Sequence, residues 1–132
     1  MHYILNTNFA NNRQDHEHML ALGKAAAFYQ RKSTVDRLEE GDEVFLYQSG
    51  VGVVAFGRAD GKLVICDHEG DPEEEHHIKL QQFRYVSPAL TAAQVKEITG
   101  TNHRFTNPLF SLGAEGGKKV SEFIHDHGLA RD

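Results

Sequence analysis

The sequence predicts an α+β domain in which about five to six strands form a small curved sheet or closed β-barrel flanked by helices. Residues 41–86 alternate apolar and polar side chains between Gly, Asp and Ser turn signals, which is typical of strands. The segments on either side carry apolar positions at helical spacing. With 132 residues, of which 39% are hydrophobic and 25% charged, we interpret residues 1–132 as a single domain.

The N-terminal third predicts a strand, a polar loop and a helical segment. Residues 2–5 are a short apolar run, and the three residues after it favour turns through local side-chain hydrogen bonds. From residue 17 to 30, apolar residues recur among good helix formers, so we expect one helix or two short helical turns. Gly23 is the point at which two such turns would separate.

Strands are predicted for the middle of the chain. Gly41-Asp42 is a turn signal, and residues 43–49 then alternate so that Phe45 and Tyr47 share one face. Residues 51–59 are rich in β-formers, and Asp60-Gly61 is a strong two-residue hairpin signal. Residues 62–67 are therefore expected to form the returning strand.

An acidic segment follows at residues 67–75. We expect a solvated loop there, because Pro72 cannot donate a hydrogen bond within a central strand. The sheet is expected to resume over residues 77–86.

The last third predicts helices. Thr91 and Gln94 form a capping-box pattern at the start of a short helix, and Gly100 is expected to end it. A terminal helix follows, with Val120 and Ile124 on its apolar face, and ends at Gly128.

Composition excludes several classes of protein. No apolar stretch approaches the ~20 residues of a membrane span, so no membrane partner is expected. The single cysteine, Cys66, cannot form an intramolecular disulfide and lies in an apolar run, which favours a buried structural thiol. We therefore expect a cytoplasmic protein.

The distribution of charge keeps nucleic acid open as a partner. The net charge is −5, but six of the 19 acidic residues lie in the segment 67–75, and the first 37 residues lean positive. Cations in this N-terminal region are the expected phosphate contacts, namely Arg13, Lys24, Arg31 and Lys32.

The block from Leu38, LEEGDEVFLYQSGVGVVAFGRADG, resembles EVE domains of the PUA-like superfamily, which are related to YTH and ASCH domains. The likeness is best from Phe45 to Gly57. The closing segment HRFTNPLFSLGAEGGKKVSEFI also looks like the end of EVE-like domains attached to modification-dependent restriction systems. The resemblance implies a PUA-like barrel, recognition of a modified base in DNA or RNA, and a fused or partner nuclease.

The resemblance also implies a site, in which a base stacks on an aromatic ring while polar groups contact its edge. The implied ligand-binding residues lie on the loop after the first strand, on the strand of Tyr47 and on a late polar loop: Asn6, Thr7, Asn8, Tyr47, Gln48, Ser49, Arg104, Phe105 and Thr106. Since the chain has no tryptophan, the stacking ring is expected from Phe28, Tyr29, Tyr47, Phe105 or Phe110.

Plainer interpretations stay open for these residues. Asn6 to Asn8 can be a simple turn, and Tyr47 can be a core residue. The site requires a hollow between the Tyr47 strand and the Arg104 loop, so a mouth filled by the protein's own side chains would contradict this placement.

No metal or other cofactor is expected. Nine histidines are present, with candidate clusters at Asp15 to His18, His76-His77 and His125 with His127. Their spacing is not that of common zinc sites, and the acidic run lacks the ligand alternation of an EF-hand. We expect both to be solvated surface.

The sequence predicts a binding module and not an enzyme. ASCH domains carry a Gly-x-Lys-x-x-Glu-x-Arg motif, and Gly117, Lys119 and Glu122 fit its first part, but Ile124 stands where the arginine is required. The alternatives are a small-ligand or nucleoside sensor with the same pocket, a protein-interaction module, and an ASCH-like hydrolase of modified nucleosides.

Overall fold

The structure is a computed structural model that describes all 132 residues of the chain. Seven strands form one curled sheet: β1 (His2–Asn6), β2 (Lys24–Phe28), β3 (Glu43–Gln48), β4 (Gly52–His68), β5 (Asp71–Leu90), β6 (Leu109–Ser111) and β7 (Ala130–Arg131). Six of them follow the order β2-β5-β4-β3-β1-β6, and β7 pairs with β5. The pair β1 and β3 is parallel, and all others are antiparallel.

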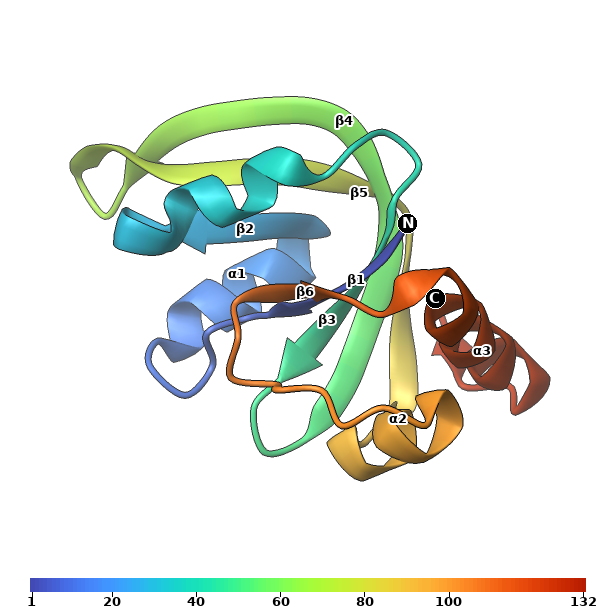
Figure 1. Cartoon of the computed structure of the whole chain (residues 1–132). Coiled ribbons are helices and arrows are strands. Elements are labelled where there is room, and N and C mark those ends of the chain that lie inside the picture. The colour runs from blue at the N-terminus through green and yellow to red at the C-terminus, as the bar shows by residue number, and fades with distance from the viewer.

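The helices lie at the two ends of the sheet. They are α1 (Arg13–Leu22), the 3-10 helix η1 (Tyr29–Arg37), α2 (Ala92–Thr99) and α3 (Gly113–Asp126). Figure 1 shows α1 near β2 at one end of the sheet and α2 and α3 together at the other, with β4 bending between the two ends. None of the helices combines the length and the apolar character needed to cross a membrane. The predicted α+β class with a curved sheet is confirmed.

Local signals placed several elements correctly. The strand predicted from residue 43 is β3, and the capping box of α2 forms, with Thr91 Oγ1 accepting from the Gln94 N–H at 3.1 Å. Gly100 ends α2 in the left-handed conformation, and α3 ends just before Gly128. These signals succeed because each depends only on neighbouring residues.

The helical segment predicted for residues 17–30 is wrong beyond Gly23. Helix α1 ends at Leu22, because Gly23 adopts φ 64 and its N–H donates to the Met19 carbonyl. The next five residues form β2, which is buried along its whole length and pairs with β5. Alanines favour a helix by intrinsic propensity, but pairing with β5 holds them in a strand.

The hairpin predicted at Asp60-Gly61 is also wrong. Strand β4 continues through these residues, and the irregular register with β5 between Ala59 and Leu63 shows a bulge there. The chain reverses at Glu69-Gly70, where both residues have positive φ, as a two-residue hairpin turn requires. The acidic segment is therefore not a loop, since Asp71 already begins β5.

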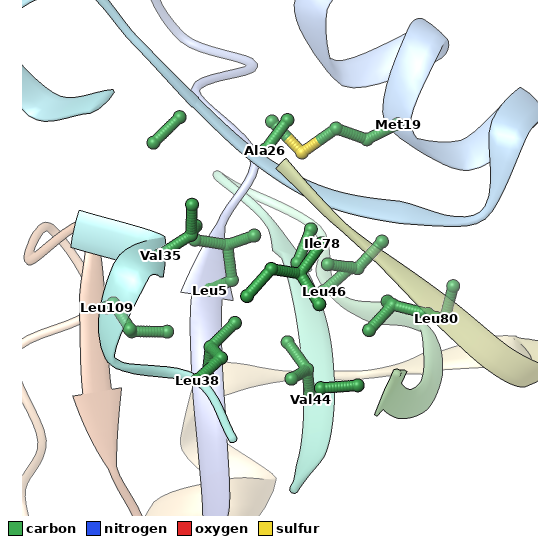
Figure 2. Close-up of a cluster of buried hydrophobic side chains, with 14 of the residues drawn as sticks. Leu5, Met19, Ala26, Val35, Leu38, Val44, Leu46, Ile78, Leu80 and Leu109 are labelled. Atoms are coloured by element: carbon green, nitrogen blue, oxygen red, sulfur yellow. The ribbon is translucent and has the colours of Figure 1, made fainter. Parts of the chain in front are cut away.

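Strand β3 separates two apolar clusters. Val44 and Leu46 face the first cluster, which also receives Met19 from α1 and Val35 from η1 (Figure 2). Phe45 and Tyr47 face the second cluster, which α2 and α3 cover with Val95, Val120 and Ile124. Both faces of β3 are therefore buried in the interior of the protein.

Candidate functional site

A pocket of about 230 Å³ opens where the ends of β1 and β2 meet the loop before α1. The two strands are not paired, so the curl of the sheet brings their ends to opposite sides of the opening. The floor is apolar, and the rim carries amides, one carboxyl, one phenol and one guanidinium. The lining residues are Leu5, Asn6, Asn8, Asn11, Asn12, Asp15, Met19, Ala26, Ala27, Phe28, Tyr29, Arg31 and Pro108.

Hydrogen bonds fix the asparagine side of the pocket. Asn6 donates from Nδ2 to the Phe105 carbonyl and accepts from the Asn8 N–H, both at 2.9 Å. Asn8 adopts φ 64, a conformation that asparagine tolerates, and its Oδ1 accepts from Asn11 Nδ2 at 2.9 Å. The Asn6 side chain therefore stabilises the loop after β1 through its hydrogen bonds. The amides of Asn8 and Asn11 lie at the rim of the pocket.

Asp15 is the carboxyl of the pocket. Burial raises its pKa above the ordinary value, and the neighbouring His68 and a hydrogen bond from Asn8 act in the opposite direction. Its backbone N–H donates to Asn12 Oδ1 at 3.2 Å, which caps α1. The helix start therefore holds this carboxyl at the inner edge of the pocket.

Two aromatic residues form the opposite wall. Phe28, at the end of β2, is buried, and its ring packs on His68 with 4.3 Å between ring centroids. Tyr29 is 39% exposed and has φ 53, which is uncommon for a bulky residue and places its ring at the rim. The Tyr29 hydroxyl donates to Asp71 at 2.8 Å, and this bond raises the pKa of Tyr29 to about 12. The hydroxyl thus stays protonated near neutral pH.

The predicted phosphate contacts have different surroundings. Arg31 is exposed at the rim and forms no ion pair. Arg13 is exposed, and its Nε lies 3.9 Å from Oε1 of Glu17. Lys32 forms an ion pair with Glu74, with 3.3 Å between Nζ and Oε2.

The interpretation of Lys24 as a phosphate contact is corrected. Its side chain is buried, and its ammonium pairs with Glu75 at 2.6 Å. Lys24 is therefore part of the interior of the protein.

The mouth predicted between the Tyr47 strand and the Arg104 loop is filled. Tyr47 is buried, and its ring packs on Phe105 with 4.7 Å between centroids, while Phe110 contacts Phe105 from the other side. Tyr47 belongs to the second apolar cluster and Phe105 and Phe110 pack against it, so the rings contact one another where a base was expected. The plainer interpretation of Tyr47 as a core residue is the one the structure supports.

The other predicted residues also lie outside the pocket. Thr7 is buried, and its Oγ1 lies 2.6 Å from His16 Nδ1. Gln48 is the last residue of β3, and Ser49 lies in the turn that follows it. Arg104 and Thr106 are exposed on the loop before β6. Of the residues expected to bind ligand, the structure gathers Asn6, Asn8, Phe28 and Tyr29 around one pocket.

Sequence reasoning missed several lining residues. Met19, Ala26 and Ala27 were assigned to a helix, and their common position at the pocket floor depends on the pairing of β2 with β5. Asn11 and Asn12 could have been found, because they extend the run of asparagines that starts at Asn6.

A second hollow, of about 300 Å³, lies beside the pocket and shares Asp15 with it. We call it the acidic hollow, and its lining residues are Gln14, Asp15, His18, Asp67, His68, Glu69 and Glu75. Burial by itself would raise the pKa of Glu75, but hydrogen bonds and charges from Lys24 and His77 outweigh burial, and the pKa lies below the ordinary value. Glu75 is therefore held as a carboxylate.

The partial ASCH-like motif lies on α3. Gly117 is buried against His2, where a larger side chain would collide. Lys119 and Glu122 form surface pairs with Glu115 and Lys118 at 3.3 and 3.9 Å. These are ordinary helix-surface contacts and form no site.

Searches of the sequence against known protein families and against curated proteins gave no match. Solved structures do match over nearly the whole chain. The ASCH protein of Zymomonas mobilis has a TM-score of 0.61 at 15% identity, covering 92% of this chain and 94% of that protein. Protein PSPTO5229 of Pseudomonas syringae has a TM-score of 0.57 at 15% identity, and the match covers 94% of this chain and 99% of that protein.

The YTH domain of Mmi1, crystallised as a complex with RNA, has a TM-score of 0.61 at 9% identity and covers 99% of this chain and 83% of that domain. At these identities the likeness concerns the fold alone, and the closer relation to EVE domains stays a prediction. The curled mixed sheet with helices at both ends is the PUA-like fold that ASCH and YTH domains share.

Proposed function

We propose that the chain is an RNA-binding module that takes one modified base into the pocket between β1 and β2 and does not catalyse a reaction. The observation that carries the proposal is the composition of this pocket, in which amides and a carboxyl face an aromatic wall over an apolar floor. Such a combination suits a flat ring with a polar edge. The fold supports RNA as the ligand, because the Mmi1 YTH domain has the same fold and binds RNA.

The size of the pocket supports a single base. Its volume of about 230 Å³ is below the ~300–1,000 Å³ of sites for drug-sized ligands. Stacking on Phe28 or Tyr29 would contribute about 1–3 kcal/mol. The apolar floor of Met19, Ala26 and Ala27 favours a base that carries an added apolar group, such as a methyl.

The rim supports a contact with the RNA backbone. Arg31 is the exposed cation of the pocket and lies free of acidic partners, so its guanidinium is available to a phosphate. A base held in the pocket would bring its own phosphate groups to this rim.

The proposal is tested by measuring fluorescence anisotropy with a panel of single-stranded RNAs that differ in one modified base. The wild-type protein is expected to prefer one modified base over its unmodified parent. Asn8→Gly removes the rim amide and suits the positive φ of this position, so it is expected to lower the preference without unfolding the protein. Arg31→Ala is expected to weaken binding to all sequences and to reduce the salt slope by about 1.

Lys118→Ala is the matched control for Arg31→Ala, because it removes one exposed cation from α3, at the other end of the sheet (Figure 1). It is expected to bind RNA as the wild type does. Equal binding by the wild type, Asn8→Gly and Arg31→Ala would show that this pocket does not hold the base.

A sensor of free modified nucleosides is the second candidate. The acidic hollow beside the pocket favours it, because four carboxylates close to the site would repel a polyanion. A sensor is expected to bind the nucleoside as tightly as the oligonucleotide, and with little dependence on salt.

We infer that binding is not followed by catalysis because no serine, threonine or cysteine lines the pocket, its one phenol, Tyr29, is held by Asp71, and its one carboxyl, Asp15, has no second acid in the lining to work with. Release of a product from a bound modified nucleoside would overturn this inference in favour of a hydrolase. The fused or partner nuclease implied by the EVE resemblance stays a prediction.

A further inference from the structure

Two segments that were interpreted as solvated surface meet at the acidic hollow. Asp15 and His18 lie one turn apart on the same side of α1, and both line it. His68 and Glu69 come from the end of β4 and the turn that follows it. These two residues reach α1 because β4 continues past Gly61. The sequence of α1 alone, or of the β4 end alone, therefore does not predict that they lie together.

His68 is the unusual member of this group. Only 9% of its side chain is exposed, and its Nε2 is buried without a hydrogen-bond partner. This nitrogen lies 3.2 Å from Asp15 Oδ1, but the approach lacks hydrogen-bond geometry. A buried imidazole nitrogen without a partner costs free energy, so it indicates a missing ligand.

The separations fit coordination of one ion. Ligand atoms that bind a metal at ~2.0–2.2 Å lie at most about 4.4 Å apart. His68 Nε2 is 3.2 Å from Asp15 Oδ1 and 4.0 Å from Glu69 Oε1, and all three atoms lie within 4.8 Å of one another. Half of the Glu69 side chain is exposed, so it can rotate toward a bound ion.

The other nitrogen of His68 faces a carboxylate. Its Nδ1 lies 3.7 Å from Glu75 Oε1, while Lys24 and His77 hold the second oxygen of Glu75, each at 2.6 Å. Metal-binding histidines commonly direct their second nitrogen at a carboxylate, which fixes the ring and strengthens the ligand. Glu75 is the carboxylate that faces this nitrogen, and because 3.7 Å is longer than a hydrogen bond, the ring would have to move toward it to be fixed in this way.

We propose that Asp15, His68 and Glu69 bind a divalent transition-metal ion in the acidic hollow. An imidazole with two carboxylates is a donor set that suits zinc, cobalt or nickel better than magnesium or calcium, which prefer oxygen ligands alone. Three protein ligands leave room for solvent or for His18 in the remaining positions. The metal proposal does not require that the pocket binds a base, although Asp15 lines both cavities.

A neighbouring group, Cys66, Glu75 and His77, does not compete for the ion. Its ligand atoms also lie within 4.8 Å of one another. However, the Lys24 ammonium lies 2.6 Å from Glu75 and would repel a cation placed there. Burial also raises the pKa of the Cys66 thiol, which disfavours the thiolate that binds metals.

The test is a titration of metal-free protein with Co²⁺, followed by visible absorption, and with Zn²⁺, followed by calorimetry and by the thermal midpoint of unfolding. The wild type is expected to bind one equivalent and to unfold at a higher temperature with the metal. Mg²⁺ and Ca²⁺ are expected to have no comparable effect at the same concentration.

The variant Glu69→Gln keeps the size of the side chain at an exposed position, so it is expected to fold and to bind Co²⁺ about tenfold or more weakly. His68→Gln and Asp15→Asn are expected to do the same, but either can also lower stability because both positions are buried. Glu17→Gln is the matched control, since it removes one carboxylate from the exposed side of α1 and is expected to bind like the wild type. Absence of saturable binding, or equal binding by Glu69→Gln and the wild type, would overturn the proposal.

Discussion

Tyr47 contributes to folding through its ring. It is buried against Phe105 in the second apolar cluster, and no hydrogen bond holds its hydroxyl. Tyr47→Ala is expected to lower the free energy of unfolding by about 3 kcal/mol, because it leaves a cavity in a packed cluster. Urea denaturation measures this change. Tyr47→Phe is the control and is expected to stay close to the wild type, whereas a larger loss for Tyr47→Phe would mean that the hydroxyl has a partner.

His103 is expected to make stability depend on pH. Its ring stacks on Phe110 with 5.3 Å between centroids, its Nε2 is buried without a partner, and burial lowers its pKa. The unfolded chain therefore binds this proton more readily than the folded protein. The stability associated with neutral His103 is fully present above about pH 6.5, the ordinary pKa of histidine. It is lost as the pH falls through the lower pKa that His103 has in the folded protein.

This pH dependence is measured by denaturation of the wild type and of His103→Phe between pH 5 and 8. The phenylalanine keeps a ring against Phe110 but cannot bind a proton, so the loss of stability toward pH 5 is expected to be smaller than in the wild type. If the free energy of unfolding changes with pH to the same extent in both proteins, the pH dependence comes from other titratable groups and not from His103.

At the scale of elements, the end of α1 depends on Gly23. This residue has φ 64, and a Cβ placed there would lie 3.2 Å from Cγ of Phe83. Gly23→Ala is expected to lower the free energy of unfolding by about 1–2 kcal/mol, because alanine disfavours the left-handed conformation. The contact with Phe83 is expected to lower it further. Gly100→Ala at the end of α2 isolates the conformational part, since nothing lies within 4 Å of a Cβ there. Thermal unfolding compares the two, and an equal loss would contradict the role of the Phe83 contact.

Local signals predicted some elements and failed for others for one physical reason. The capping box of Thr91 and the alternation in β3 depend on residues close in sequence. The length of β4 and the strand at Ala25 to Ala27 depend on β5, which lies about fifty residues away from β2 in the chain. An Asp-Gly signal such as Asp60-Gly61 can mark either a turn or a bulge, and only the partner strand decides which.

At the scale of the whole molecule, the candidate site follows the same rule. Asn6, Asn8 and the aromatic pair at the end of β2 were expected among the residues that contact a base, and the structure brings them together. The same resemblance also placed Tyr47 and the late loop in the site, but the Phe105 ring packs on Tyr47 where a ligand was expected. Side-chain packing at a barrel mouth depends on both loops at once, so no pattern in either segment predicts it.

The long strands β4 and β5 also connect the regions around the two apolar clusters. Strand β5 contributes Ile78 and Leu80 to the first apolar cluster and Val86 and Leu90 to the second. Strand β4 likewise passes from the second cluster, at Val53, to the acidic hollow at His68. The acidic hollow is therefore carried by the same two strands that run through both clusters, whereas the pocket is lined by other elements.

Asp15 forms a wall common to the pocket and the acidic hollow. Any occupant that moves or neutralises this carboxyl from one side alters the free energy of binding on the other. Thermodynamic linkage then requires reciprocity, so the factor by which a cation changes the affinity for a base equals the factor by which the base changes the affinity for the cation. One shared side chain is enough to make two adjacent cavities a coupled pair.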